Sequence, residues 1–345
     1  MIGINLGVVG LRGLGINHIR RAQDITNVNV IAIADSNEER LREAGNEFGI
    51  DHCYNDASLL FEHADLDGVV LAVPNHLHAP LAVQALSAGI NVLVEKPIAS
   101  NKLQAQQMIE ARDLSGKCLM VGYNQRFQPQ VPSFRRHLMD GSIGKVVYAR
   151  ALWNRRAWGT ETERGNWFLD PKLSGGGPLV DLGIHKLDLA LHLMGYPEVS
   201  SVFGFTTQGI GRAHFEKKDL EWKIEDAAVA MIRFMNGSVL HLESSFYLNT
   251  ETESQHKVVF YGDKGGAIAT HDEKWGVFLA TQDGNKNLPL ELDDKWAATS
   301  VEHFVQVLRG ESDLSATAEE GLIGLCILEA IYESASVGYE VKFAK

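Results

Sequence analysis

Short apolar segments alternate with segments of helical period through the first third of the chain. Continuous runs rich in Val and Ile predict strands over residues 4–10, 28–34, 68–73, 91–94 and 118–122. Amphipathic stretches predict helices over residues 14–23, 37–48, 77–87 and 103–114. Strands that are apolar on both faces and alternate with helices form parallel sheets covered on both sides. Residues 1–122 are therefore predicted to form a doubly wound α/β domain.

The hydrophobic pattern changes after residue 122. One strongly apolar helix is predicted over residues 178–194, and most segments from residue 199 onward have the character of strands. The dipeptide Asn236-Gly237 predicts a hairpin with a type I′ turn. Helical periodicity returns over residues 294–308 and 317–334. Residues 123–345 are therefore expected to form a second, α+β domain with a mainly antiparallel sheet.

Composition narrows the class of protein. The chain has 345 residues, 45% of them hydrophobic, which fits a globular protein with two domains. Its net charge of −12 argues against nucleic acid or an anionic membrane as the main partner. No segment approaches the roughly 20 apolar residues of a membrane span. The three scattered cysteines, Cys53, Cys118 and Cys326, exclude a disulfide framework, so a cytoplasmic protein is expected.

A glycine-rich loop, Gly10-Leu11-Arg12-Gly13-Leu14-Gly15, lies where the first predicted strand turns into the first helix. Glycines there let backbone N–H groups approach a pyrophosphate at the helix N-terminus. Asp35 follows at the end of the second strand, where a carboxylate can accept hydrogen bonds from an adenosine ribose. The combination predicts a dinucleotide site.

Two residues of this region bear on which nicotinamide cofactor binds. Arg12 stands where the strict glycine motif has its second glycine, and it could attract a 2′-phosphate. Asp35 would repel that phosphate, and the following Ser36 and Asn37 carry no positive charge. We therefore expect NAD, with NADP less favoured.

A polar stripe lies along the apolar helix predicted over residues 178–194. At about 100° per residue, Asp181, His185, Asp188 and His192 fall within a sector about 60° wide. Apart from Lys186, the rest of the helix is nearly all apolar. The stripe is compatible with a structural Asp–His ladder, with a metal site completed by further ligands, or with acid–base chemistry. Periodicity alone leaves these three interpretations open.

Five motifs in the chain resemble successive motifs of one enzyme family. They are Val73-Pro74-Asn75-His76-Leu77-His78, residues 88–97 ending in Glu95-Lys96-Pro97, residues 122–127, residues 175–188 and the turn at 261–266. The family is the glucose–fructose oxidoreductase, inositol dehydrogenase and rhizopine-catabolism group, usually called Gfo/Idh/MocA. The resemblance runs in order from the N-terminus to at least residue 270.

The resemblance implies an architecture and a catalytic trio. The architecture is a Rossmann domain followed by an open, mainly antiparallel domain whose sheet often mediates assembly, so a homodimer or homotetramer is expected. The trio would be Lys96, Asp181 and His185. In this assignment His185 takes the hydroxyl proton, Lys96 stabilises the developing alkoxide, and Asp181 holds the imidazole or a substrate hydroxyl.

The resemblance and the loop motif together give the remaining site residues, with no metal among their ligands. The cofactor-binding set is Gly10, Leu11, Arg12, Gly13, Gly15, Asp35, Ser36, Pro74, Asn75, His78, Glu95 and Lys96. The substrate set is Asn124, Asn154, Asp181 and His185. A structural role explains His78 equally well, because it begins a helix.

Aromatic and basic residues gather between the predicted strand at 146–153 and the polar helix. Residues 153–159 and 164–168 together hold Trp153, Arg155, Arg156, Trp158, Arg164 and Trp167. Aromatic faces suit a sugar or cyclitol, and the arginines could meet a carboxylate or phosphate. An ordinary hydrophobic anchor with solvated arginines explains the segment equally well.

These patterns favour an NAD(P)-dependent oxidoreductase that transfers a hydride between nicotinamide and a secondary alcohol or ketone of a sugar, cyclitol or related polyol. One alternative is a non-catalytic cofactor-sensing protein of the same fold, and another is a glycoside-cleaving variant that uses bound NAD transiently. A metal hydrolase built on His76-x-His78 ranks last, because the strand-rich second half lacks eight βα units.

Overall fold

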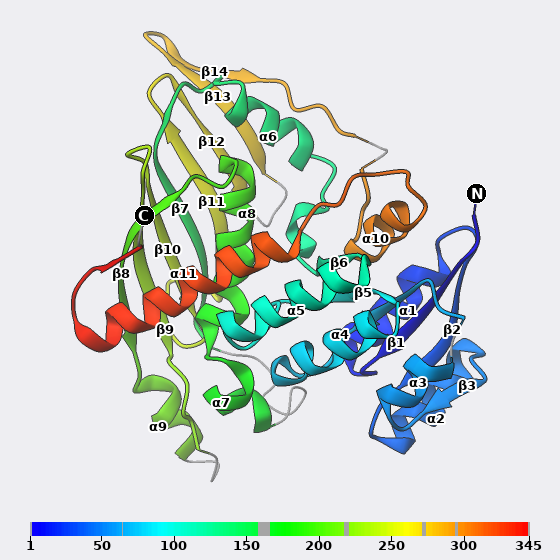
Figure 1. The fold of residues 1–345 in the computed structure, drawn as a ribbon. Helices are drawn as coiled ribbons and strands as arrows, with labels where there is room; N and C mark the ends of the chain where they lie inside the picture. Colours follow the sequence, from blue (N-terminus) through cyan, green and yellow to red (C-terminus); the bar gives the residue numbers. More distant parts are fainter. Residues whose placement is uncertain are drawn as a thin grey trace. The chain divides into compact units, whose positions relative to one another are not determined.

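The computed structural model describes residues 2–63, 65–157, 166–216, 221–270, 274–293 and 296–343. The chain divides into two compact units (Figure 1). The first contains residues 1–127 and 297–325, and the second contains residues 128–296 and 326–345.

The first unit is built on a parallel sheet of six strands in the order β3-β2-β1-β4-β5-β6. Its strands are β1 (Ile4–Val9), β2 (Val28–Ala34), β3 (His52–Tyr54), β4 (Gly68–Leu71), β5 (Asn91–Val94) and β6 (Leu119–Val121). All four residues of β4 are buried, as expected for a strand covered on both faces. The order reverses direction between β1 and β4, which is the arrangement of the Rossmann fold. The predicted doubly wound α/β class is confirmed.

Local sequence signals set the helices of this unit. They are α1 (Gly13–Gln23), α2 (Glu38–Phe48), α3 (Ala57–His63), η1 (Asn75–Leu77), α4 (His78–Ser87), α5 (Lys102–Ser115), η2 (Asn124–Arg126) and α10 (Ser300–Leu308). The side chains of Asn37 and Asn101 cap α2 and α5 at their N-termini. Gly49 and Gly116 end the same two helices in the left-handed conformation.

Helix α10 shows why the boundary differs from the predicted split at residue 122. It comes from late in the chain and packs against α1 in the first unit. The ring of Phe304 lies where a Cβ on Gly68 would be, 2.7 Å from the nearest ring atom. A segment expected in the second domain therefore completes the core of the first. Apolar periodicity identifies the helix but not the sheet that it covers.

The second unit contains a nine-stranded sheet in the order β14-β13-β12-β11-β7-β10-β9-β8-β15. Its strands are β7 (Val146–Arg155), β8 (Val199–Thr207), β9 (Ala227–Phe234), β10 (Val239–Ser245), β11 (Ser254–Gly262), β12 (Gly265–Thr270), β13 (Trp275–Thr281), β14 (Gly284–Leu288) and β15 (Val341–Lys342). Neighbouring strands are antiparallel except for β7 and β10, which are parallel. The predicted α+β domain with a mainly antiparallel, open sheet is confirmed.

The hairpin between β9 and β10 forms as predicted, but its turn differs. A type I′ turn needs positive φ at both central residues, whereas Gly237 (φ +87°) has a positive φ and Asn236 does not. Phe234 and Ser238 close a three-residue loop through the hydrogen bond from Phe234 N–H to the Ser238 carbonyl. The Asn236 side chain accepts from the N–H and hydroxyl of Ser238, and this local bond favours the longer loop.

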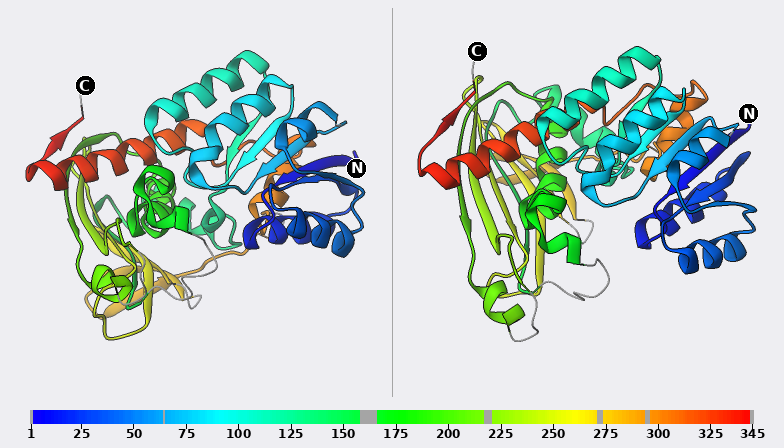
Figure 2. Two further views of the ribbon diagram at one scale, coloured as in Figure 1. Left: turned by 90° about the horizontal axis from the view of Figure 1, so that it is seen from below. Right: turned by 60° about the horizontal axis from the view of Figure 1, so that its bottom comes forward.

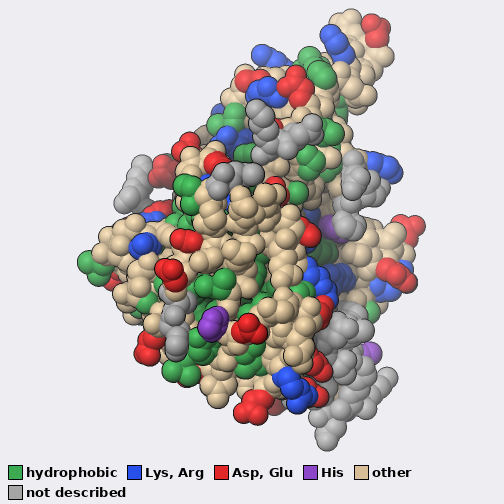
Figure 3. Space-filling view, turned by 90° about the vertical axis from the view of Figure 1, so that its right-hand side faces the viewer, with side chains coloured by type: hydrophobic (Ala, Val, Ile, Leu, Met, Phe, Trp, Pro, Cys, Tyr) green, Lys and Arg blue, Asp and Glu red, His purple; other side chains and the backbone are tan. Residues whose placement is uncertain are grey.

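The helices of the second unit include two that pack on one face of its sheet. They are α6 (Val131–Met139), η3 (Asn166–Leu169), α7 (Pro171–Ser174), η4 (Leu179–Gly183), α8 (Ile184–Met194) and α9 (Ile210–Glu216), together with the later part of α11 (Ala318–Val337). Helix α8 packs on β7 and β11, and α6 packs on α8 (Figure 2). Among the described residues, no helix is both long and apolar enough to cross a membrane. Acidic and basic side chains are interspersed over the face in Figure 3.

Candidate active site

The glycine-rich loop joins β1 to α1 at the point where the strand order of the first sheet reverses. Gly10 has a φ of +90°, and a Cβ there would lie 2.4 Å from the carbonyl oxygen of Ala72. A Cβ on Gly15 would overlap the carbonyl oxygen of Gly10, whereas one on Gly13 would meet nothing within 4 Å. Gly10 and Gly15 therefore shape the loop, and Gly13 leaves space beside the helix N-terminus for a phosphate group. Arg12 is exposed in the same loop.

Asp35 is buried at the end of β2 and is held by residues on both sides of it. Its Oδ2 accepts from the N–H of Leu11 at 2.8 Å, and its Oδ1 accepts from the N–H of Asn37 at 2.8 Å. Arg40 adds a two-pronged contact, with Nη2 2.7 Å from Oδ1 and Nε 3.3 Å from Oδ2. Burial raises the pKa of Asp35, but the bonds from Arg40 and the two N–H groups outweigh it and lower the pKa overall. Ser36 is exposed beside it.

Arg40 was missed by the sequence interpretation, which considered only the residues directly after Asp35. It lies in the first turn of α2, five residues beyond Asp35. The first turn of a helix that directly follows a strand lies near the carboxyl end of that strand. A basic residue in this turn was therefore a recognisable signal of a cation beside Asp35. A cation therefore does stand beside the predicted ribose carboxylate.

Glu95 makes a buried pair with a histidine that the sequence interpretation did not select. The carboxylate is buried, and its Oε1 lies 2.7 Å from Nε2 of His18 on α1. Burial raises the pKa of Glu95, whereas the His18 bond lowers it, and the net direction is downward. The pair connects the helix after the glycine loop to the residue before Lys96. Glu95 therefore joins the helix that follows the glycine-rich loop to the segment that contains Lys96.

His78 is fully buried, and backbone carbonyls engage both of its ring nitrogens. Nδ1 lies 2.7 Å from the oxygen of Pro97, and Nε2 lies 3.0 Å from the oxygen of Val73. Burial is the main reason that the pKa of His78 is lowered. Its placement corresponds to the structural interpretation, since the imidazole joins the Val73 loop to the turn after Lys96.

The remaining residues assigned to the first unit lie at the carboxyl ends of its strands. Pro74 and Asn75 follow β4, with Asn75 buried in η1. Lys96 follows β5, is partly exposed and is joined to Pro97 by a cis peptide bond. Asn124 follows β6, and its Oδ1 accepts from the hydroxyl of Ser300 at 2.9 Å. Ligands of open parallel sheets bind at this edge.

The polar helix of the second unit does not begin as a regular α-helix. Residues Leu179–Gly183 form a π turn, in which the N–H of Ile184 bonds to the carbonyl of Leu179. The α-helix α8 starts only at Ile184. The prediction of one regular helix over 178–194 was therefore wrong in its first turn, so Asp181 does not share the 100° spacing of the later residues. Such π turns are frequent at functional sites.

A partly buried carboxylate holds the start of this π turn. Glu225 accepts from the N–H of Gly177 at 2.9 Å, from the N–H of Leu179 at 3.1 Å and from the hydroxyl of Tyr332 at 2.8 Å. A Cβ on Gly176 would lie 2.0 Å from the Tyr332 hydroxyl oxygen, so the glycines allow this approach. Burial raises the pKa of Glu225 and, with the Glu225 charge, that of Tyr332.

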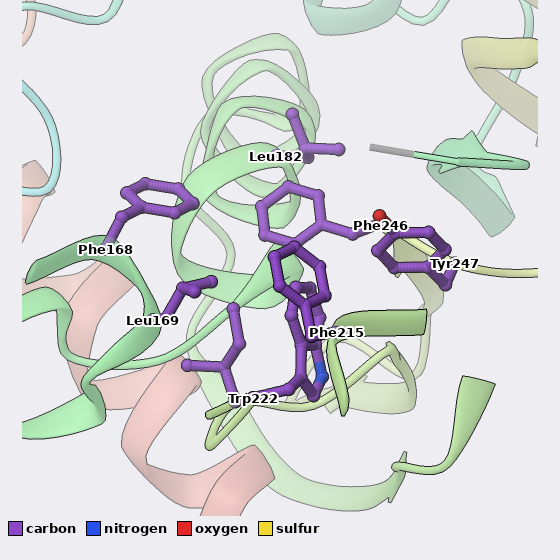
Figure 4. Packing of buried hydrophobic residues seen from close by; sticks show 8 residues of the cluster. Phe168, Leu169, Leu182, Phe215, Trp222, Phe246 and Tyr247 are labelled. Atoms are coloured by element: carbon purple, nitrogen blue, oxygen red, sulfur yellow. The ribbon is translucent and has the colours of Figure 1, made fainter. Parts of the chain in front are cut away.

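An aromatic cluster supports the π turn from the other side. Leu182 points toward the ring of Phe246 within a core that also contains Phe168, Trp222 and Tyr247 (Figure 4). Asp181 itself is buried. The position of Asp181 is therefore fixed by its packed neighbour and by the anchored start of the turn.

The members of the polar stripe differ in how far they are buried. From Leu179 to Leu193 every residue is buried except His185, which is partly exposed. Asp188 is buried and accepts from the hydroxyl of the partly exposed Tyr196 at 3.2 Å. His185 is thus the more exposed of the two imidazoles in this helix segment, and its acid–base role stays a prediction.

Trp153 of β7 contacts His185 and several other basic side chains. Its ring centroid is 5.7 Å from that of His185 and 4.7 Å from that of His256, on which it stacks. The Arg155 guanidinium and the Lys186 ammonium lie 5.4 and 5.5 Å from the indole. Burial lowers the pKa of Lys186 to about 8. The sequence interpretation noted Lys186 only as an exception on an apolar helix.

Asn154 lies on the other face of the sheet. Consecutive strand residues point to opposite faces, and Trp153 faces α8. The Asn154 amide donates to Glu243 at 3.0 Å, and Arg150 donates to the same carboxylate. This placement does not support the predicted substrate contact of Asn154. Alternation along the predicted strand was the available signal.

Two further predictions fall partly or wholly beyond what the structure describes. Trp158, Gly159, Arg164 and Gly165 of the aromatic and basic segment lie outside the described residues. Within the described ranges, no group of three or more His, Cys, Asp or Glu side chains could hold a metal ion. Metal-independent activity stays a prediction.

Sequence profiles of one oxidoreductase family match both units. Residues 4–123 match its NAD-binding Rossmann fold, and residues 135–343 match its C-terminal alpha/beta domain. The chain belongs to the Gfo/Idh/MocA family. The predicted resemblance is confirmed, and this Gfo/Idh/MocA protein is an oxidoreductase with a nicotinamide-nucleotide-binding domain.

Several relatives of this Gfo/Idh/MocA protein have names that state a reaction. D-glucoside 3-dehydrogenase of Escherichia coli (strain K12) is 30% identical over 326 residues, covering 91% of this chain and 90% of that protein. Myo-inositol 2-dehydrogenase of Thermotoga maritima is 25% identical over 350 residues, covering 98% and 99%.

Solved structures share the whole fold of this Gfo/Idh/MocA chain. Levoglucosan dehydrogenase in complex with NADH and levoglucosan has a TM-score of 0.85 at 23% identity and covers all of both chains. GenD2 from gentamicin A biosynthesis, in complex with NAD, has a TM-score of 0.83 at 24% identity and covers 100% of this chain and 97% of that one.

Proposed function

We propose that this protein is an NAD-dependent dehydrogenase or reductase acting on a secondary alcohol or ketone of a sugar, cyclitol or related polyol. The observation that carries the proposal is the exposure of His185 alone along the otherwise buried segment from Leu179 to Leu193. The names of the relatives, which refer to a glucoside and to inositol, support the substrate class.

Each predicted catalytic residue has a role that its chemistry allows. The nicotinamide cofactor supplies the hydride acceptor or donor when bound. His185 accepts the hydroxyl proton during oxidation and returns it during reduction. Lys96 provides a cation of the kind that stabilises a developing alkoxide. Asp181, fixed in the π turn, orients the imidazole or a neighbouring substrate hydroxyl.

The first unit has the features that a dinucleotide needs. Gly13 leaves space beside the N-terminus of α1, and Asp35 ends β2 as an ionised carboxylate. Asp35 is hydrogen-bonded by Arg40 and by two backbone N–H groups, so a ribose hydroxyl has to share this carboxylate with Arg40.

We expect NAD(H) to bind more tightly than its 2′-phosphorylated form, because Asp35 repels a 2′-phosphate while its own charge neutralises Arg40. Asp35→Ala should weaken NAD(H) binding and release Arg40 to pair with a 2′-phosphate, which reverses the preference or removes it. Fluorescence titrations of both cofactors against both proteins measure this. Tighter NADP(H) binding by the unmodified protein would show that Arg12 or Arg40 controls the choice.

A spectrophotometric screen tests the function itself. Reduction of NAD is followed at about 340 nm across sugars, glycosides, cyclitols and other polyols, with NADP in parallel. Turnover of at least one class supports the proposal. Cofactor binding without turnover of any class would favour the cofactor-sensing alternative, which the presence of Lys96, Asp181 and His185 argues against. Cleavage of a glycoside without net NAD reduction would identify the other variant.

We also propose that the protein forms a homodimer or homotetramer through the second sheet. On the face opposite α8, Phe203, Phe205, Val229 and Met231 are exposed on the paired strands β8 and β9. Contiguous exposed apolar side chains of this kind mark an interaction surface. Phe205→Glu together with Met231→Glu should convert the assembly to monomers in light scattering, whereas a native mass of 38.0 kDa for the unmodified chain would contradict assembly.

A further inference from the structure

Lys186 is a buried cation that the proposed reaction does not use. It is 5% exposed, on a helix whose other core-facing residues are largely apolar. No carboxylate within the described residues forms an ion pair or hydrogen bond with its ammonium group. Lysines are rarely buried without a partner, because the desolvated charge is costly. The charged form of Lys186 therefore has no compensating carboxylate among the described residues.

The contact made by Lys186 is the face of Trp153, with Nζ 5.5 Å from the ring centroid. A cation–π contact offsets part of the cost of burial but leaves the three N–H donors of the ammonium available. The Trp153 indole N–H is a second buried donor that has no partner among the described residues. One donor thus belongs to the indole itself and the other to the side chain that lies over its face.

The Trp153 ring also contacts a second cationic side chain and the proposed catalytic base. The Arg155 guanidinium lies 5.4 Å from the indole, and His256 stacks on it. His185 packs against Trp153 with ring centroids 5.7 Å apart. The Lys186 ammonium and the Arg155 guanidinium therefore both lie within cation–π distance of this one indole. The proposed catalytic base and these two cationic side chains thus contact the same ring.

We propose that Lys186, with Trp153 and Arg155, recognises an anionic group on the substrate, so that the substrate is an acidic sugar or polyol carrying a carboxylate or a phosphate. The inference rests on the proposed function, and it narrows the substrate class of that same site. A carboxylate or phosphate oxygen would accept from the Lys186 ammonium and from the indole N–H, satisfying both buried donors.

Equilibrium binding to the cofactor-loaded protein tests this independently of turnover. The probes are D-glucose, D-glucuronate and D-glucose 6-phosphate, with inorganic phosphate alone as a fourth ligand, in low-salt buffer at neutral pH. We expect at least one charged sugar to bind about 10-fold or more tightly than D-glucose, as a charge-assisted hydrogen bond allows. The glucuronate and phosphate arms distinguish the two anions, and inorganic phosphate shows whether the sugar ring is required.

Lys186→Met is the matched variant, because methionine fills a similar volume without charge. It should bring the affinity ratio of charged to neutral sugar close to one while leaving cofactor binding intact. Lys172→Met, which removes an exposed lysine of the same unit, is the control and should keep the ratio of the unmodified protein.

Three results would overturn the proposal. They are equal affinity of the unmodified protein for the charged and neutral sugars, no binding of either charged sugar at millimolar concentration, and an unchanged ratio in Lys186→Met. Turnover of neutral polyols alongside any of these results would leave the proposed dehydrogenase function standing. Preference for the charged sugars without turnover of any substrate would support anion recognition and contradict the proposed dehydrogenase function.

Discussion

Replacing His185 with alanine is expected to lower kcat by about 10²- to 10⁴-fold, the usual contribution of a positioned acid–base group. Folding and cofactor affinity should change little, because His185 is the one partly exposed residue between Leu179 and Leu193. The pH profile should lose the limb that reports protonation of the base. The measurement is steady-state NAD reduction across pH, with the substrate found by the screen.

Two neighbouring positions supply the comparison for this variant. Asp188→Asn and His192→Ala alter buried residues further along α8 and should act mainly on stability. If His185→Ala keeps near-normal turnover but unfolds easily, the stripe is a structural ladder after all. If all three variants lose activity in proportion to stability, no catalytic role is assigned to the histidine.

Lys186→Met is expected to raise the free energy of unfolding at pH 7, by up to about 3 kcal/mol. Burial lowers the pKa of this lysine from 10.5 to about 8. Between these pH values the unfolded chain holds a proton that the folded chain has lost, so the lysine's destabilising effect shrinks as pH rises. At about 1.4 kcal/mol per pKa unit, the full effect is present below pH 8. Lost contact with Trp153 reduces the gain.

Urea unfolding at intervals from pH 7 to pH 10 measures this difference. The advantage of Lys186→Met over the unmodified protein should be largest at pH 7 and should shrink toward pH 10. Lys172→Met should show no pH-dependent advantage, because that lysine is exposed. A Lys186→Met protein that is less stable at every pH would contradict the prediction, because the buried charge would then not be destabilising.

The fold was predictable where one local signal determined the outcome. The run at 28–34 is almost wholly apolar, as expected for a strand of a parallel sheet that is covered on both faces. Its assignment as such a strand therefore followed from the sequence pattern alone. The return of α10 to the first unit was not predictable in this way, because periodicity describes a helix without its partner. The turn at Asn236 also depended on a side-chain bond to Ser238 that competes with the expected turn type.

The site was predictable as a set of residue types but less so as a geometry. The glycine loop and Asp35 were recognisable from their spacing, whereas the π turn that carries Asp181 was not. A π turn contains a single residue more than an α turn. In a segment that is almost wholly apolar there is no polar–apolar periodicity that the extra residue could disturb, so the sequence does not reveal it. Lys186 was visible in the sequence, but its importance depends on burial, which the pattern of neighbours does not give.

The division of the chain also determines when each unit can be completed during synthesis. The first unit needs residues 297–325, and the second needs residues 326–345. Tyr332 joins the π turn through Glu225, and β15 pairs with β8 only once Val341 and Lys342 are made. A nascent chain therefore cannot complete the first unit before residue 325 is made, nor the second before residue 342, and both then form through contacts distant in sequence, a topology that folds slowly.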